Sequence, residues 1–334
     1  MTTSPDPRPF AAARACGLLD TLDFQLRRTL KKPDSSQAHD LRVAIRRFGQ
    51  SLAVFESCFG SGIAQRIERE LNTVMKLAGK VRDSDIVLKM LGELDPVPTK
   101  VKAKIERKRD KTEVELTDAI ARWIGRGEPA RWRLNLEAKR GTPRATAALP
   151  ADLNRAILRI AQRFFDRGVK AWHSKDSGKA LHRLRIATKR LRYTFELAGK
   201  SAGESGAAGD PTDRWGLGQL KDLQSGLGDI HDLVTVREIL SKHHGSKKML
   251  EPIVDKERTG IREFRELWKR EFRGGAHRGR WMARATKLAE TLINAGNSEV
   301  GTAEGATAER AKSAGPAVAK KTDQRKRPTR SMGQ

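Results

Sequence analysis

Apolar residues recur every three or four positions through most of the chain. Leu18, Leu22 and Leu26 form one such set, and Ile157, Ile160 and Phe164 form another. This spacing places side chains on one face of an α-helix, whereas the alternation typical of a β-strand is absent from the sequence. The pattern predicts an all-α protein. The expected helices span about 11–31, 36–58, 63–77, 82–94, 99–124, 153–172, 179–198, 212–225, 229–240, 250–272 and 281–295.

Small and polar residues mark the expected helix ends. Ser35 or Ser36 is predicted to cap the second helix, and Gly79 is predicted to interrupt the third. Asp83 and Asp232 each follow a glycine by four residues, and we interpret both as N-terminal caps of short helices. The segment between residues 125 and 150 is expected to be an irregular, basic connection.

One nine-residue pattern, H-x-L-R-[VI]-A-x-[KR]-R, occurs twice and begins at His39 and at His182. On a helix with about 100° per residue, the histidine and two basic residues share one face, opposite an apolar stripe. The residues on these two basic faces are His39, Arg42, Arg46, His182, Arg185 and Lys189. Arg47 and Arg190 lie on the flanks.

These faces carry like charges four residues apart without an acid between them. Such pairs destabilise a helix by a few tenths of a kcal/mol, so a bound anion is the natural way to offset the repulsion. The alternative is that two basic surface helices resemble one another by chance in a basic protein. The repetition of residue types at the same spacing favours the anion site.

The repetition extends beyond the motif. Residues 70–85 align with residues 219–234, so that Gly79 matches Gly228 and Asp83 matches Asp232. We therefore expect an internally duplicated helical bundle of two units, each with about four to six helices. Packing of the units about a pseudo-two-fold axis would bring the motif helices together around one basic groove or pore.

The predicted boundaries follow from this repeat. One domain is expected over residues 10–295, with its first repeat at about 10–147 and its second at about 148–295. Residues 1–9 contain three prolines, and residues 296–334 are rich in Ala, Gly, Ser, Lys and Arg. Both ends are predicted to be disordered, the second as a basic tail.

Charge and composition narrow the class of partner. The chain has 334 residues and a formal net charge of +26, which predicts a polyanion such as nucleic acid, anionic lipid or an inorganic polymer. Cys16 and Cys58 are too few for a disulfide framework or a zinc cluster and are expected in the core. The sequence contains neither a membrane-length apolar stretch nor a signal peptide pattern, so we expect a cytoplasmic protein.

The doubled motif, with G-x-x-[RH]-D following each copy, resembles the CHAD domain (conserved histidine α-helical domain) over residues 10–295. The resemblance implies an all-helical, duplicated fold that binds inorganic polyphosphate in a central pore and needs no cofactor. The residues it implies as phosphate contacts are His39, Arg42, Arg46, Arg47, His182, Arg185, Lys189, Arg190, Arg192 and Lys221. Gly49 stands where the second copy has Arg192, which implies a weaker first half-site.

Two other functions compete with this interpretation. Nucleic-acid binding usually uses aromatic platforms, but the chain has one tyrosine, Tyr193, for which packing is favoured over stacking. The basic tail remains a candidate for non-specific nucleic-acid binding. His39-Asp40 and His231-Asp232 resemble the HD pairs of metal phosphohydrolases, yet the surrounding cations would repel a metal ion. We expect a non-catalytic protein that serves polyphosphate granule targeting or phosphate storage, with tighter binding below about pH 6.5 as histidines gain protons.

Overall fold

The computed structural model describes residues 6–59, 62–93, 99–137, 148–174, 177–198, 216–242 and 247–313, and every regular element in these ranges is a helix. This confirms the all-α prediction. The first series comprises α1 (Arg8–Lys31), α2 (Ser35–Val54), α3 (Glu56–Phe59), α4 (Ile63–Gly92), α5 (Thr99–Gly125) and α6 (Glu128–Glu137). The second comprises α7 (Leu149–His173), α8 (Ser177–Glu196), α10 (Leu217–Lys242), α11 (Lys247–Glu271) and α12 (Gly275–Ser313).

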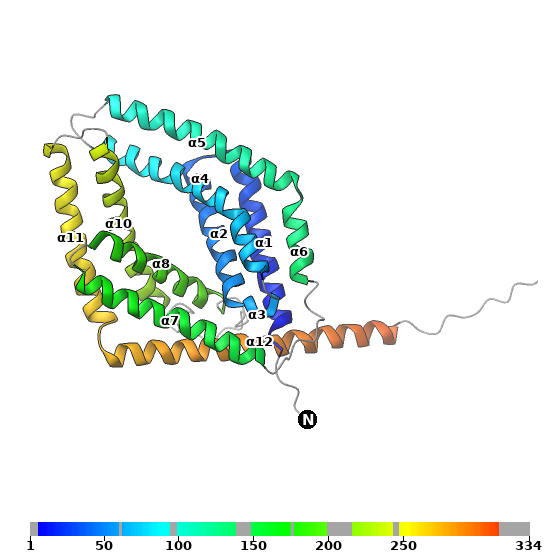
Figure 1. Cartoon of the computed structure of the whole chain (residues 1–334). Helices are drawn as coiled ribbons and strands as arrows, with labels where there is room; N and C mark the ends of the chain where they lie inside the picture. The colour runs from blue at the N-terminus through cyan, green and yellow to red at the C-terminus, as the bar shows by residue number, and fades with distance from the viewer. Residues whose placement is uncertain are drawn as a thin grey trace, which may run out of the picture.

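The two series have the same order of neighbours. In the first, α1 packs on α2, α2 on α4 and α4 on α5; in the second, α7 packs on α8, α8 on α10 and α10 on α11. Across the series, α2 contacts α8 and α4 contacts α10, while α12 runs along α7 and reaches α1 (Figure 1). The helices that carry the matched sequences are therefore adjacent. The duplication itself stays a prediction from the sequence.

Two groups of buried apolar side chains hold this arrangement. The larger one spans both series and includes Phe48, Trp132 and Trp268, each 1% exposed or less. A smaller one lies where α4, α5, α10 and α11 meet; its buried members are Val87, Leu91, Ile105, Val236, Leu240 and Ile253. Each buried aliphatic side chain contributes about 1.5–3 kcal/mol relative to an exposed one. The smaller group therefore fixes α4 against α10.

The start of α2 differs by one residue from the predicted cap. Asp34, not Ser35 or Ser36, is the N-cap, and its carboxylate accepts a hydrogen bond of 2.8 Å from the backbone N–H of Gln37. A carboxylate at this position also interacts favourably with the positive end of the helix dipole. This cap fixes the residue at which the helix carrying the first motif begins.

Neither repeat glycine interrupts its helix. Gly79 lies inside α4 and Gly228 inside α10, and both helices continue without a break. A glycine inside a helix costs about 1 kcal/mol relative to alanine, which packing of the surrounding turns easily offsets. The interpretation of Asp83 and Asp232 as caps is therefore wrong, because both lie well inside long helices.

The region expected to be an irregular connection contains α6. Gly127 adopts a φ of 67° between α5 and α6, a conformation that favours glycine. The helix then buries Trp132, whose ring stacks on Phe48 at 6.1 Å and meets Trp123 edge-on at 4.8 Å. The apolar contacts of one tryptophan thus order a segment whose composition predicted a loop.

The chain ends also differ from the expectation. Helix α1 begins at Arg8, where Asp6 pairs with the guanidinium at 2.7 Å, and α12 continues to Ser313. Residues 1–5 and 314–334 lie outside the described residues. Among the described helices, none combines the length and the apolar character that crossing a bilayer requires.

Candidate anion-binding site

Basic side chains from α2, α4, α8 and α10 come together where these four helices meet. They interact electrostatically with one another across the boundary between the two series. We call this group the cationic cluster. Its members are His39, Arg42, Arg46, Arg82, His182, Arg185, Lys189 and His231, together with the carboxylates of Asp83 and Asp232.

The arginines and the lysine on the two motif helices lack partners of opposite charge. Arg42, Arg46, Arg185 and Lys189 form no ion pair within the described part of the chain. The Nε atom of Arg185 is buried and has no hydrogen-bond partner. An unsatisfied buried donor costs about 1–3 kcal/mol, and more when it is charged. The cluster therefore has the capacity to bind an anion that would satisfy these groups.

Burial and mutual repulsion disfavour the protonated forms of these bases. The pKa of Lys189 is lowered to about 6. Burial is the larger cause, and the charges of Arg185 and Arg46 add to it. Burial, aided by Arg46, lowers the pKa of Arg42 to about 10, and it also lowers the pKa of Arg185. A lysine so perturbed is largely neutral at pH 7.5 until a negative charge approaches it.

The histidines of the cluster respond in the same direction. Burial and the charge of Arg185 lower the pKa of His231 to about 4, and its ring centroid lies 5.0 Å from that of His182. Partial desolvation lowers the pKa of His182 and of His39, with smaller contributions from Arg185 and Arg82 respectively. All three imidazoles are therefore poised to take up a proton beside an anion.

The two carboxylates of the cluster do not neutralise it. Burial raises the pKa of Asp83 and of Asp232, against the opposing effect of Arg185 and Arg82. Within the described residues, no group of three or more His, Cys, Asp or Glu side chains is arranged to hold a metal ion. With cations outnumbering two carboxylates, the site suits a polyanion rather than a divalent metal.

Gly79 positions one of the cluster arginines. A Cβ atom at this position of α4 would overlap the Nη1 atom of Arg42, whereas a Cβ at Gly228 would meet nothing within 4 Å. The guanidinium of Arg42 thus lies directly over the bare backbone of α4. The two matched glycines differ in this respect, so their substitution should have different consequences.

Arg47 and Arg192 lie outside the cationic cluster, in the C-terminal halves of the motif helices. Arg47 Nε donates to Glu196 Oε2 at 3.0 Å, and Arg192 Nη1 donates to Glu196 Oε1 at 2.6 Å. Arg14 of α1 joins them, since its Nη2 donates to the backbone carbonyl of Glu196 at 3.1 Å. We call Arg14, Arg47 and Arg192 the arginine trio.

The remaining predicted contacts are not joined to either group. The Arg190 and Lys221 side chains are exposed, and within the described residues no ion pair or hydrogen bond of either is seen. Gly49, which replaces the motif arginine in the first copy, faces open space, because a Cβ there would meet nothing within 4 Å. Roles for Arg190 and Lys221 stay predictions.

Sequence reasoning missed five residues that belong to these groups. Arg82, His231 and their neighbouring aspartates were visible as the repeated G-x-x-[RH]-D, but they were assigned to helix starts because of the glycines. Arg82 and His231 occupy the same position in the two aligned segments. A basic residue repeated at this position was the sequence signal that could have identified both. No sequence pattern pointed to Arg14, which reaches Glu196 from 182 residues away.

Tyr193 packs between helices. It is 4% exposed, and Arg192 lies over its ring at 4.7 Å while Arg47 lies 6.0 Å from its centroid. The ring face is thus covered by protein cations. This agrees with the packing role favoured from the sequence and leaves no platform on which a base could stack.

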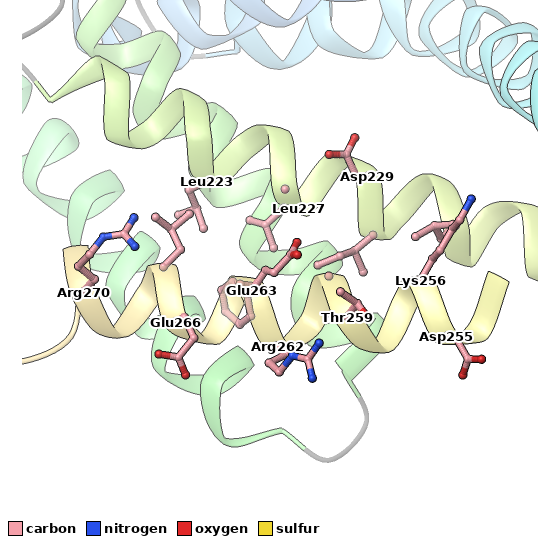
Figure 2. Close-up of a pocket in the computed structure, with 16 residues that line it drawn as sticks. Leu223, Leu227, Asp229, Asp255, Lys256, Thr259, Arg262, Glu263, Glu266 and Arg270 are labelled. Atoms are coloured by element: carbon pink, nitrogen blue, oxygen red, sulfur yellow. The ribbon is translucent and has the colours of Figure 1, made fainter. Parts of the chain in front are cut away.

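A separate cavity of about 790 Å³ lies between α10 and α11, away from the predicted contacts. Leu223 and Leu227 of α10 face α11 across it, and charged residues such as Lys256 and Arg270 lie at its edge (Figure 2). None of the ten predicted phosphate contacts lines this cavity. The cavity lies beside the place where α10 and α11 pack closely, with the Ile230 side chain against the backbone of Gly260. It is not part of the cationic cluster.

Comparison with known proteins identifies the fold. No curated protein matches the chain. The crystal structure of the CHAD domain from the plant Ricinus communis is similar with a TM-score of 0.51 and 18% identity, over 85% of this chain and 93% of that one. PptA from Streptomyces chartreusis gives a TM-score of 0.54 and 16% identity, over 80% of this chain and 98% of that one. The CHAD domain family profile matches residues 13–241, and the chain belongs to this family.

Proposed function

We propose that this protein binds inorganic polyphosphate through the cationic cluster, without catalysing a reaction. The observation that carries the proposal is the set of four motif cations that form no ion pair in the described residues. Arginine offers planar, bidentate hydrogen bonding to phosphate oxygens and lysine offers a point charge, so the cluster suits a flexible chain of phosphates. Membership of the CHAD family, which is associated with polyphosphate binding, supports the same ligand.

The cluster favours polyphosphate over nucleic acid. Proteins that bind single strands combine cations with aromatic side chains that stack on bases. Here Tyr193, which lies on the second motif helix, is buried under arginines. The proposed biological use is targeting to polyphosphate granules or regulation of phosphate storage, because a non-catalytic binder can recruit or sense its ligand.

A competition titration tests the proposal. The full-length protein is bound to labelled long-chain polyphosphate at about 150 mM salt and challenged with unlabelled polyphosphate, DNA and RNA, since screening at this ionic strength limits non-specific attraction. Polyphosphate is expected to compete at least ~100-fold better than either nucleic acid by phosphate concentration. Equal competition by all three would mean that general positive charge explains the binding.

Binding should be coupled to proton uptake. The pKa of Lys189 is about 6 in the free protein and those of His39 and His182 are lowered, whereas bound phosphates would raise all three. Affinity is therefore expected to rise by about 10-fold or more as the pH falls from 8 to 6, because the free protein then carries more of the needed protons. Isothermal titration in two buffers of different ionisation heat measures the uptake. Equal affinity at both pH values would exclude the titrating bases from the contact.

Gly79→Ala is expected to weaken binding, although alanine favours the helix. The added methyl group would displace the Arg42 guanidinium, and loss of one charge-assisted contact corresponds to about a 10-fold weaker affinity. Gly228→Ala is the matched control, since its methyl group enters open space. It should retain binding and gain up to ~1 kcal/mol of stability. Equal affinities of the two variants would contradict the role of Gly79.

A further inference from the structure

The arginine trio places three guanidinium groups around one residue, Glu196, whose carboxylate accepts from two of them. Glu196 accepts from Arg47 at 3.0 Å and from Arg192 at 2.6 Å, and its backbone carbonyl accepts from Arg14 at 3.1 Å. Arg192 is held further by Gln224 of α10, at 2.8 Å. One negative charge thus faces three positive charges, and the group keeps a net positive charge.

The trio is incompletely satisfied. The Nε atom of Arg14 is buried without a hydrogen-bond partner, and burial together with the charge of Arg47 lowers the pKa of this arginine. The side chains of Arg192 and Glu196 are 16% and 23% exposed, so the pair is mostly buried but still reached by solvent. A second anion brought to this place would gain contacts that Glu196 alone does not fill.

The trio continues the cationic cluster along the motif helices. Arg192 follows Arg185 by two helical turns on the same face of α8, a rise of about 10 Å. Tyr193 connects the two groups, because it interacts with Arg185 and lies under the guanidinium of Arg192. A phosphate chain that fills the cluster and extends towards the C-terminal ends of α2 and α8 would therefore reach Glu196.

We infer that Glu196 is a built-in competitor that occupies the arginine trio until a long polyphosphate chain displaces its carboxylate. The inference rests on the proposed function and adds chain-length discrimination to it. A short oligophosphate binds to the cationic cluster alone and leaves the ion pairs of Glu196 intact. A long chain engages the trio as well, but must break the two side-chain ion pairs of Glu196 first.

The test compares long-chain polyphosphate with tripolyphosphate on the wild-type full chain and on Glu196→Gln. The variant should bind the long chain about 5-fold more tightly, because the competing charge is gone, and bind tripolyphosphate as the wild type does. At about 150 mM salt the screening length is about 8 Å, so loss of a remote charge alone should have little effect on tripolyphosphate. Glu238→Gln removes an exposed carboxylate of α10 as a control and should alter neither affinity.

The possible results separate the two levels of the account. Equal tightening of both ligands, or of neither, would overturn the competitor role while leaving the polyphosphate site intact. Failure of the wild type to bind either ligand would overturn the proposed function and this inference together. If Glu196→Gln does not fold, NMR of the arginine Nε–H groups in the wild type decides: the Arg47 and Arg192 signals should shift with the long chain and stay unchanged with tripolyphosphate. Unchanged signals with both would contradict displacement.

Discussion

Replacement of Arg42, Arg46, Arg185 and Lys189 by alanine is expected to weaken long-chain polyphosphate binding by about 1,000-fold or more. Each charge-assisted contact contributes about 1.5–3 kcal/mol, and four such losses exceed a 1,000-fold change even when they are not additive. The slope of log affinity against log salt should fall as well, because fewer counterions are released on binding. Fluorescence anisotropy with labelled polyphosphate at several salt concentrations measures both quantities.

A charge-matched variant separates the site from the net charge. Lys100, Lys104, Lys108 and Lys111 are exposed on α5, so their replacement by alanine also removes four positive charges. This variant should lose at most a few-fold in affinity, because screened charges on that surface act only at long range. Comparable losses in the two variants would show that the position of the cations is unimportant.

Lys189→Met is expected to stabilise the free protein while it weakens polyphosphate binding. Burial lowers the pKa of Lys189 to about 6, well below the value of about 10.4 in an unfolded chain, so folding at pH 7 requires the lysine to lose a proton. Removing this cost should raise the free energy of unfolding by about 1–3 kcal/mol after allowance for solvent screening, and the Tm by about 2–5 °C. Affinity should fall about 10-fold or more.

The pH dependence of this gain identifies its cause. A base with a lowered pKa destabilises the fold fully below the folded pKa and not at all above the unfolded one. The advantage of Lys189→Met should therefore be largest near pH 6 and shrink towards pH 10. Lys104→Met removes an exposed lysine of α5 and should show neither effect. A gain of equal size at pH 6 and pH 10 would attribute the stabilisation to apolar packing instead.

Much of the fold follows from the sequence, because the apolar period sets each helix. The prediction was wrong where contacts between residues distant in sequence determine whether a segment is helical. Gly79 resembles a helix end, yet the Arg42 guanidinium packs over it and α4 continues. Residues 128–137 resemble a basic loop, yet they form α6, in which the Trp132 ring stacks on Phe48.

The site was predicted in part for the same reason. Six of the ten predicted contacts lie in the cationic cluster, because helical period alone puts them on one face. Arg47 and Arg192 engage Glu196 instead: the Arg192 pair lies within α8, and the Arg47 pair joins α2 to α8. Neither the Arg47 pair nor the contribution of Arg14 follows from local spacing, since both depend on how the two series pack.

The most direct measurement is a crystal structure of the full-length protein with long-chain polyphosphate. The account predicts phosphate density between α2 and α8, within hydrogen-bonding distance of the Arg42 and Arg185 guanidinium groups and of Lys189 Nζ. It also predicts that the buried Nε of Arg185, unpartnered in the free protein, donates to a phosphate oxygen. Density confined to the exposed lysines of α5, with the cationic cluster unchanged, would contradict the account.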